Sequence, residues 1–120
     1  MQKQILIVDD EKNIRLTLRR SLETLHFEIQ EALTGEEALE MINTQHFDLV
    51  LLDLKLPGIS GLDVIRQVRN TDNPVKIIII SAHGTIEAAV ESMKLGASDF
   101  IEKPFTPDEI RQLVLKHIEE

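Results

Sequence analysis

Three short apolar runs constrain the fold of this sequence more than any other feature. They span residues 5–8, 49–52 and 77–80 and contain only isoleucine, leucine and valine. A run of this length without polar alternation is typical of a strand that is buried on both faces of a sheet. The three runs therefore predict a sheet that is covered on both sides.

Two more strands are expected at residues 27–31 and 98–101, where polar residues interrupt the apolar pattern as they do at sheet edges. Between the strands, apolar residues recur with the period of a helix. They form three sets: Ile14, Leu18, Leu22 and Leu25; Ile86, Ala89, Val90 and Met93; and Ile110, Leu113 and Val114. Helix starts are indicated by two pairs with the spacing of a capping box, Thr34 with Glu37 and Thr106 with Glu109.

The alternation of five strands with five helices predicts a fold of the α/β class. Right-handed crossovers, with the two mixed strands at the edges, favour a single doubly wound, five-stranded parallel sheet. The expected strand order is 2-1-3-4-5, which is the flavodoxin-like (βα)5 arrangement. A chain of 120 residues is long enough for one ordinary core, so residues 1–120 are expected to form one domain.

Composition excludes several classes of function. With 13 basic and 21 acidic residues the net charge is -8, so we expect no direct binding to nucleic acid. The sequence has no cysteine, which rules out thiolate zinc sites and cysteine nucleophiles. Its apolar runs are too short to cross a bilayer and the N-terminus lacks the pattern of a signal peptide, so a cytoplasmic location without membrane contact is expected.

Polar side chains gather where the predicted strands end. Asp9 and Asp10 follow the first strand, Asp53 the third, Ser81 the fourth and Lys103 the fifth. Parallel strands bring their carboxyl ends to one edge of the sheet, and ligands of doubly wound folds bind beyond that edge. The sequence therefore predicts one pocket that holds three carboxylates, a hydroxyl and an ammonium group.

Three adjacent carboxylates repel one another at neutral pH unless a cation or a shared proton lies between them. Oxygen ligands in partial number, with room for water and a phosphate, suit Mg²⁺. A metal, a lysine and a hydroxyl beside a free carboxylate are the groups that phosphoryl transfer requires. We expect neutralisation of one member, for example Asp10→Asn, to relieve the repulsion and to stabilise the metal-free protein.

Four segments carry a resemblance to a known family. In chain order they are ILIVDDE, DLVLLDLKLPGISG, IIIISAHG and DFIEKPF. Together they resemble the receiver domain of response regulators in bacterial two-component signalling, and the resemblance covers the whole chain. Residues 81–105 most resemble the receivers of enhancer-binding transcription activators.

The resemblance implies a role for each residue at the predicted pocket. Asp53 is the implied phosphoacceptor, with the phosphohistidine of a sensor histidine kinase or a small donor such as acetyl phosphate as the source. Asp10, Asp53 and the backbone carbonyl of Lys55 are the implied direct ligands of Mg²⁺. Asp9 is implied to act on the metal through a water molecule.

Further implied roles concern signal transmission. Lys103 pairs with the phosphoryl oxygens, and Ser81 donates its hydroxyl to the phosphoryl group when the domain is activated. Phe100 occupies the position of the family's switch aromatic, which often is tyrosine, and phenylalanine lacks the hydroxyl group that a tyrosine would offer. The peptide between Lys103 and Pro104 is implied to be cis.

The implied function is a phosphorylation-activated switch, which catalyses its own phosphorylation and dephosphorylation but does not turn over an external substrate. The partner surface comprises the fourth helix, the fifth strand and the fifth helix. This surface is expected to control an output domain beyond this chain or another partner, or to form a homodimer. His83, two residues after Ser81, is expected near the pocket mouth, whereas His26, His46 and His117 are expected to be structural or solvated.

Three alternatives remain open at this point. A phosphohydrolase of the haloacid dehalogenase type also uses an aspartate nucleophile with Mg²⁺, but it needs D-x-D after the first strand, and here two aspartates are adjacent. A nucleotide- or dinucleotide-binding domain would have a glycine-rich loop after the first strand, where this chain has VDDEKN. The third alternative is a degenerate receiver that only binds partners.

Overall fold

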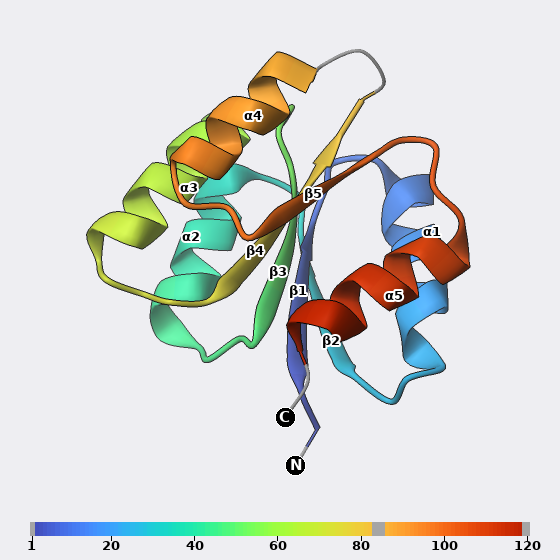
Figure 1. Cartoon of the computed structure of the whole chain (residues 1–120). Coiled ribbons are helices and arrows are strands. Elements are labelled where there is room, and N and C mark those ends of the chain that lie inside the picture. The colour runs from blue at the N-terminus through green and yellow to red at the C-terminus, as the bar shows by residue number, and fades with distance from the viewer. Residues whose placement is uncertain (1, 83–85, 119–120) are drawn as a thin grey trace.

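A parallel sheet forms the centre of the molecule (Figure 1). The computed structural model describes residues 2–82 and 86–118, and within these residues the sheet has five strands in the order β2-β1-β3-β4-β5. The strands are β1 (Gln4–Val8), β2 (Glu28–Ala32), β3 (Leu49–Asp53), β4 (Lys76–Ser81) and β5 (Asp99–Glu102). All four neighbouring pairs are parallel, so the predicted class and strand order are confirmed.

Helices cover both faces of this sheet, as Figure 1 shows. They are α1 (Lys12–Glu23), α2 (Gly35–Thr44), α3 (Gly61–Asn70), α4 (Ile86–Lys94) and α5 (Pro107–His117). One face is covered by α1 and α5, and the other by α2, α3 and α4. Among residues 2–82 and 86–118, none of the helices has the length and apolar composition needed to cross a membrane.

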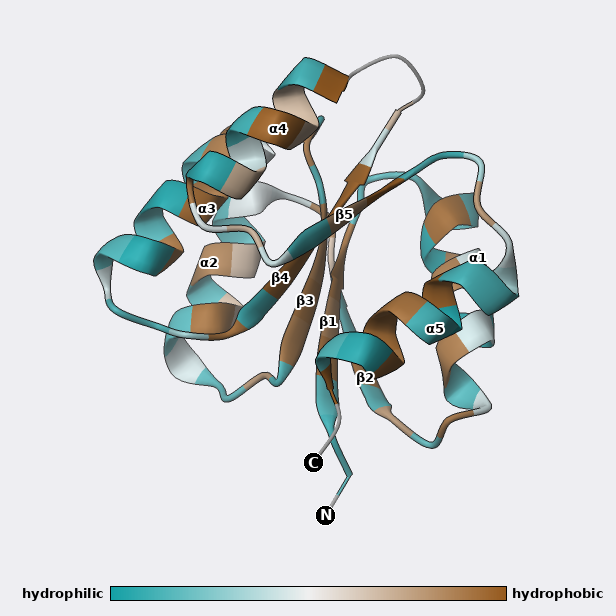
Figure 2. Cartoon of the chain, in the orientation of Figure 1, coloured by the Kyte–Doolittle hydropathy of each residue, from teal (hydrophilic) through white to brown (hydrophobic). Residues whose placement is uncertain are grey.

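Side chains along each central strand point alternately to the two faces of the sheet, which explains why these strands are apolar throughout. In β1, Leu6 and Val8 belong to the core under α2 and α3, whereas Ile5 and Ile7 belong to the core under α1 and α5. The strands β3 and β4 alternate in the same way between the two cores. Figure 2 shows these strands as the hydrophobic centre of the molecule, so every side chain of each run is needed in one of two separate cores.

The edge strands are displaced by one residue from their expected positions. The second strand was expected at 27–31 and lies at Glu28–Ala32, where Ala32 pairs with Val8. The fifth was expected at 98–101 and lies at Asp99–Glu102. Ser98, directly before β5, is still bound to β4: its N–H donates to the Ile77 carbonyl at 2.7 Å and its hydroxyl oxygen accepts from the Ile77 N–H at 3.1 Å.

The two predicted capping boxes have different outcomes. At α5, the Thr106 hydroxyl accepts from the Glu109 N–H and the Glu109 carboxylate accepts from the Thr106 N–H, which is the complete box. At α2, the Thr34 hydroxyl accepts from the Glu37 N–H at 3.0 Å. The Glu37 carboxylate, however, accepts from the N–H of Leu33 at 2.9 Å, one residue before the N-cap, so only half of the second box forms.

The apolar set on α4 does not form a buried face. Ala89 is fully buried, but Ile86, Val90 and Met93 are 50%, 47% and 38% exposed. The residue that accompanies Ala89 in the interior is Ser92, whose hydroxyl donates to the Ala89 carbonyl at 2.6 Å. Helix α4 therefore contacts the sheet through small side chains and presents its large apolar side chains to solvent.

Close packing of α3 against the end of β3 holds the backbone of Asp53 in place. Gly61 begins α3, and its N–H donates to the Leu54 carbonyl at 3.0 Å. A Cβ atom at Gly61 would lie 2.7 Å from the Asp53 carbonyl oxygen and 2.7 Å from the Leu54 Cα. Both neighbours are backbone atoms, so a side chain at this position forces α3 or the end of β3 to move.

We predict that Gly61→Ala destabilises the protein by about 1–3 kcal/mol, because the added methyl group overpacks a backbone contact. Urea unfolding monitored by far-UV circular dichroism would measure the change. Gln67→Ala, at an exposed position of the same helix, is the matched control and should leave stability within about 0.5 kcal/mol of the wild type. Equal effects of the two substitutions would contradict the packing argument.

Candidate functional site

The side chains predicted from sequence to converge do so at the carboxyl edge of the sheet. Asp9 and Asp10 follow β1, and Lys103 follows β5. Asp53 and Ser81, expected just after their strands, are instead the last residues of β3 and β4, where they pair with Ile80 and Glu102. The ladder therefore extends to Asp53 and Ser81 and fixes the positions of their Cα atoms.

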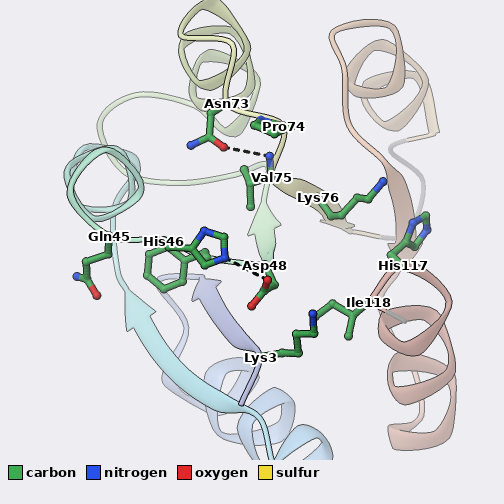
Figure 3. A pocket seen from close by; sticks show the side chains of 11 residues that line it. Lys3, Gln45, His46, Asp48, Asn73, Pro74, Val75, Lys76, His117 and Ile118 are labelled. Atoms are coloured by element: carbon green, nitrogen blue, oxygen red, sulfur yellow. Dashed lines mark hydrogen bonds and ion pairs between the residues drawn. The ribbon is translucent and has the colours of Figure 1, made fainter. Parts of the chain in front are cut away.

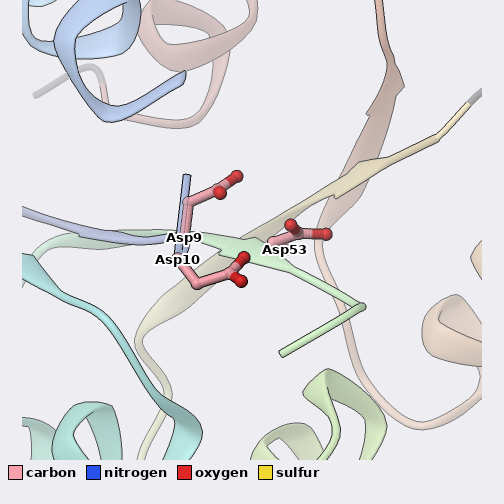
Figure 4. Close-up of side chains that lie close together, drawn as sticks. All are labelled: Asp9, Asp10 and Asp53. Carbon is pink, nitrogen blue, oxygen red and sulfur yellow. The ribbon is translucent and has the colours of Figure 1, made fainter. Parts of the chain in front are cut away.

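Three carboxylates form a compact cluster at this edge (Figure 4). One oxygen from each of Asp9, Asp10 and Asp53 lies within 4.8 Å of the others. Asp9 is 0% and Asp53 5% exposed, whereas Asp10 is exposed to solvent. The cluster thus has two members in the protein interior and one at its mouth.

Lys103 supplies the positive charge beside the cluster. Its Nζ lies 3.5 Å from Asp53 Oδ2, 3.6 Å from Asp9 Oδ2 and 3.3 Å from Glu11 Oε1. Partial burial opposes the charge on Lys103, but the nearby carboxylates, Asp53 and Asp9 first, outweigh it and raise the lysine pKa. Its backbone N–H donates to the Ser81 carbonyl at 2.8 Å, so Lys103 is held beside the end of β4.

Asp9 is the member of the cluster whose charge is least favourable. Its Oδ1 accepts from the Glu11 N–H at 2.8 Å, but Oδ2 is buried and has no hydrogen-bond partner in the described part of the chain. Burial raises the pKa of Asp9 from its usual 3.8 to about 6, and the charge of Asp53 adds to this increase, while Glu11 N–H and Lys103 act against it. A cation at this edge would favour the ionised form.

The remaining predicted residues surround Asp53. The Lys55 N–H donates to Asp53 Oδ1 at 3.1 Å. Ser81 is 1% exposed and its hydroxyl has no hydrogen-bond partner within residues 2–82 and 86–118. Phe100 is half-buried against the core on the α3 side of the sheet. The Lys103–Pro104 peptide bond is cis, the isomer that the resemblance implies.

The histidines do not join the cluster where the structure describes them. His46 lies 3.2 Å from Asp48 and His117 lies 2.9 Å from Asp99, and both contacts are ion pairs when the imidazole is protonated. His26 is exposed in the turn after α1. His83, expected near the pocket mouth, lies outside the described residues.

Sequence reasoning missed two residues that contact the cluster. Glu11 shares Lys103 with Asp53, and its signal in the sequence was its place directly after the two aspartates. Arg15 Nη1 donates to the Asp9 carbonyl at 2.9 Å. Nothing in the sequence marked Arg15, because it lies one turn into a helix among other charged residues.

A second hollow, of about 420 Å³, lies at the opposite edge of the sheet (Figure 3). It is lined by residues at or just before the starts of strands, including Lys3, Asp48 and Lys76, and by His117 and Ile118 at the end of α5. None of the residues predicted to take part in phosphoryl transfer lines it. The residues expected to carry that chemistry therefore lie away from this hollow.

The donor set at the carboxyl edge fits a hard divalent cation. It consists of carboxylate oxygens, one of which is buried without a hydrogen-bond donor in the described residues, and Lys103 offsets part of their charge. Mg²⁺ prefers oxygen ligands and keeps part of its water shell, which an exposed position such as that of Asp10 permits. The residues present could hold such an ion.

A sequence model described as the response regulator receiver domain matches residues 5–115. The chain belongs to this family. As a receiver domain of two-component response regulators it is a signalling domain, and membership implies control by phosphorylation. This decides against the phosphohydrolase of the haloacid dehalogenase type and against the dinucleotide-binding domain.

Curated relatives differ greatly in length. Sporulation initiation phosphotransferase F of Bacillus subtilis is 36% identical over 118 residues, which are 98% of this chain and 95% of that protein. The alginate biosynthesis transcriptional regulatory protein AlgB of Pseudomonas aeruginosa is 37% identical over 118 residues, but these are only 26% of its length. The chain thus spans nearly all of one relative and about a quarter of the other.

Solved structures agree with the receiver fold. The receiver domain of NtrX from Brucella abortus superposes with a TM-score of 0.89 at 36% identity, over 94% of this chain and 96% of that one. The chemotaxis response regulator CheY4 of Vibrio cholerae gives 0.91 over 98% of this chain and all of that one, and at 24% identity it supports the fold alone. The relatives include the AlgB and NtrX proteins, in agreement with the resemblance of residues 81–105 to receivers of enhancer-binding activators.

The raised pKa of Asp9 predicts how the stability of this receiver domain depends on pH. A folded-state pKa of about 6 against 3.8 means that folding favours protonated Asp9, so this contribution is present below pH 3.8 and is lost as the pH rises through 6. Ionised Asp9 then costs about 3 kcal/mol at neutral pH. In chelator, Asp9→Asn should therefore be more stable than the wild type by up to that amount at neutral pH.

Urea unfolding of both proteins in chelator, at neutral pH and near pH 4, would measure this difference. The gain should disappear near pH 4, where Asp9 of the wild type is also protonated. Asp10→Asn is the matched control, and it should gain less because the Asp10 carboxylate is exposed. A gain of the same size at both pH values would show that ionisation of Asp9 is not the cause.

Proposed function

We propose that this receiver domain is a phosphorylation-activated switch in which Asp53 accepts a phosphoryl group from the phosphohistidine of a sensor histidine kinase. The reaction depends on Mg²⁺, and the phosphorylated domain acts through the surface formed by α4, β5 and α5. The domain promotes its own phosphorylation and dephosphorylation, without turnover of an external substrate. Residues 1–120 form the whole receiver domain in this proposal.

The observation that carries the assignment is the position of Asp53 between the cluster and Lys103. Of the three carboxylates, Asp53 is the one whose backbone is fixed as the last residue of a strand. Its side chain also lies 3.5 Å from Lys103 Nζ and accepts a hydrogen bond from the Lys55 N–H. Asp9 is fully buried and Asp10 lies at the mouth, so each is better suited to hold a cation than to attack. A carboxylate oxygen of Asp53 attacks phosphorus, and the bond from phosphorus to the histidine nitrogen breaks with its electron pair on that nitrogen.

Asp10, Asp53 and the backbone carbonyl of Lys55 are the proposed direct ligands of the metal, and Asp9 acts through a water molecule. When bound, Mg²⁺ neutralises charge on the phosphoryl oxygens and orients the group for transfer. In this proposal, the carboxylates of Asp9 and Asp10 lie next to Asp53 so that the metal is bound beside the phosphoacceptor. Lys103 offsets only part of the charge of the three carboxylates, and the surplus negative charge within the described residues supports cation binding.

Lys103 and Ser81 are proposed to contact the transferred group. Lys103 is already between Asp53 and Asp9, and its ammonium can turn from these carboxylates to a phosphoryl oxygen. The Ser81 hydroxyl is buried without a partner in the described residues, so it can donate to a phosphoryl oxygen without breaking another hydrogen bond. This change at the end of β4 is proposed to shift Phe100 and α4 between two states.

The output of the switch is proposed to act through α4. Its exposed side chains Ile86, Val90 and Met93 offer an apolar contact surface beside β5. The occupant is an output domain that follows this chain, a partner protein or a second copy of the domain. AlgB is named as a transcriptional regulatory protein, which supports a transcriptional output for this chain. The net charge of -8 supports an output in which the receiver itself does not contact nucleic acid. A cytoplasmic location is part of the same proposal.

We predict that acetyl phosphate with Mg²⁺ adds one phosphoryl group to the wild type and none to Asp53→Asn. Intact-mass spectrometry would measure this, and beryllofluoride would supply a non-covalent mimic for amide NMR spectra. Asp10→Asn should retain the acceptor but react more slowly, because it loses a metal ligand. Equal labelling of wild type and Asp53→Asn would overturn the assignment, and no labelling of either protein would favour the degenerate receiver.

We predict that Ser81→Ala is phosphorylated but does not undergo the full change at Phe100 and α4. Since the hydroxyl is buried and unpaired in the described residues, its removal should not destabilise the resting protein, and a loss of response cannot be due to unfolding. Amide chemical shifts before and after beryllofluoride, with a melting curve as the control, would test this. A full wild-type shift in the variant would remove Ser81 from the route.

A further inference from the structure

Asp10 depends on its main chain for its position. Its side chain is exposed, and in the described part of the chain its carboxylate has no hydrogen-bond or ion-pair partner. Asp9 and Asp53, by contrast, each accept a backbone hydrogen bond on one carboxylate oxygen. The proposed metal ligand at the mouth of the cluster is therefore oriented by the backbone of residues 9–11.

Arg15 bonds to the residue on each side of Asp10, once through its side chain and once through its backbone. Its Nη1 donates to the carbonyl oxygen of Asp9 at 2.9 Å. Its own N–H donates to the carbonyl oxygen of Glu11 at 3.1 Å, in the first turn of α1. The backbone bond to Glu11 is the usual bond of a first helical turn and is kept whatever side chain stands at position 15. The contact that depends on the Arg15 side chain is the one with the carbonyl of Asp9, the residue directly before Asp10.

The guanidinium of Arg15 is itself fixed by the neighbouring strand. Its Nε lies 3.0 Å from Oε1 of Glu31 in β2, and the Arg15 side chain is only 13% exposed. Burial acts to raise the pKa of Glu31, but hydrogen bonds from Arg19 and Arg15 outweigh it and lower that pKa, so the carboxylate stays charged. Arg15, in α1, thereby connects the residue after β1 with β2 beside the cluster.

We propose that Arg15 is a positioning residue for Asp10, and that its bond to the Asp9 carbonyl sets the affinity of the cluster for Mg²⁺. This inference rests on the proposed function, because it takes the cluster to be a metal site. A guanidinium can donate to two acceptors in fixed directions, which a lysine ammonium on a flexible stem cannot reproduce. Removal of a group that orients metal ligands typically weakens metal binding about 10- to 100-fold.

Electrostatics alone predicts the opposite change in Mg²⁺ affinity when Arg15 is replaced. Removal of a positive charge near three carboxylates favours a cation, so a variant without the Arg15 charge should bind Mg²⁺ more tightly if charge were the only effect. Positioning predicts weaker binding in the same variant. The direction of the change in affinity therefore separates the two explanations.

Arg19 provides a matched control. Its Nε lies 2.6 Å from the other oxygen of Glu31, and its Nη2 donates to the Ile29 carbonyl at 3.3 Å. Arg19→Gln removes the same charge and an ion pair with the same carboxylate, but it leaves the bond from Arg15 to Asp9 in place. The pair of variants thus isolates the contact with the backbone of Asp9.

Titration calorimetry of unphosphorylated wild type, Arg15→Gln, Arg15→Lys and Arg19→Gln with Mg²⁺ would test the inference, since the chain has no tryptophan or tyrosine for a fluorescence signal. Both Arg15 variants should bind Mg²⁺ about tenfold more weakly or worse, and Arg19→Gln close to the wild type. With acetyl phosphate, the Arg15 variants should need more Mg²⁺ for half-maximal phosphorylation but approach the wild-type rate at saturation. Arg15→Lys keeps the charge and serves where Arg15→Gln does not fold.

The outcomes separate this inference from the proposed function. Wild-type affinity in both Arg15 variants, tighter binding in Arg15→Gln, or equal weakening in the Arg15 and Arg19 variants would each overturn the positioning role. If the wild type itself neither binds Mg²⁺ nor becomes phosphorylated, the proposed function fails, and the inference fails with it. Weakened binding confined to the Arg15 variants, with melting temperatures of Arg15→Lys and Arg19→Gln alike, supports it.

Discussion

The carboxylate of Asp9, buried beside that of Asp53, is the feature on which the rest of the carboxyl edge depends. Two acidic groups with 0% and 5% exposure are held next to each other, and the pKa of Asp9 rises to about 6 because burial and its neighbour both disfavour the charge. Lys103 reduces this cost but does not remove it, since its one ammonium is also shared with Glu11. The resting site therefore retains an excess of negative charge that a cation can neutralise.

The apolar sheet makes this arrangement possible. The strands β1, β3 and β4 are buried on both faces, and their side chains divide between two separate cores. The burial of these side chains stabilises the fold and offsets the free-energy cost of the ionised Asp9 carboxylate at the carboxyl edge. The hydrogen bonds between the strands keep the strand ends in register. The close contact of Gly61 with the Asp53 backbone adds to this by restricting movement of the end of β3, which carries the proposed phosphoacceptor.

Much of the fold could be predicted because it follows from patterns along the chain. Uniformly apolar runs identify central strands, mixed runs identify edges, and parallel strands bring the first polar residue after each run to one place. Burial within the cluster could not be predicted, since adjacent aspartates look alike in sequence and only the direction of the chain after β1 distinguishes buried Asp9 from exposed Asp10. Arg15 was missed for a related reason: its acceptors, the Asp9 carbonyl and Glu31, come from the residue after β1 and from β2.

In helix α4, most of the apolar residues that recur with helical period are not the residues that are buried. Its apolar residues share a face, but the residues that enter the core are the small Ala89 and Ser92, and the larger Ile86 and Val90 remain exposed. A helix that rests on small side chains gains less from burial than one that buries leucine or isoleucine, so its position is less strongly determined. This helix follows β4, the strand that ends at Ser81, whose hydroxyl has no partner in the described residues. In the proposed function, Ser81 can therefore change its hydrogen bonding without breaking another bond. The helix that follows it along the chain, α4, is held by small side chains and can move at a low free-energy cost, while Asp53 stays fixed by the core.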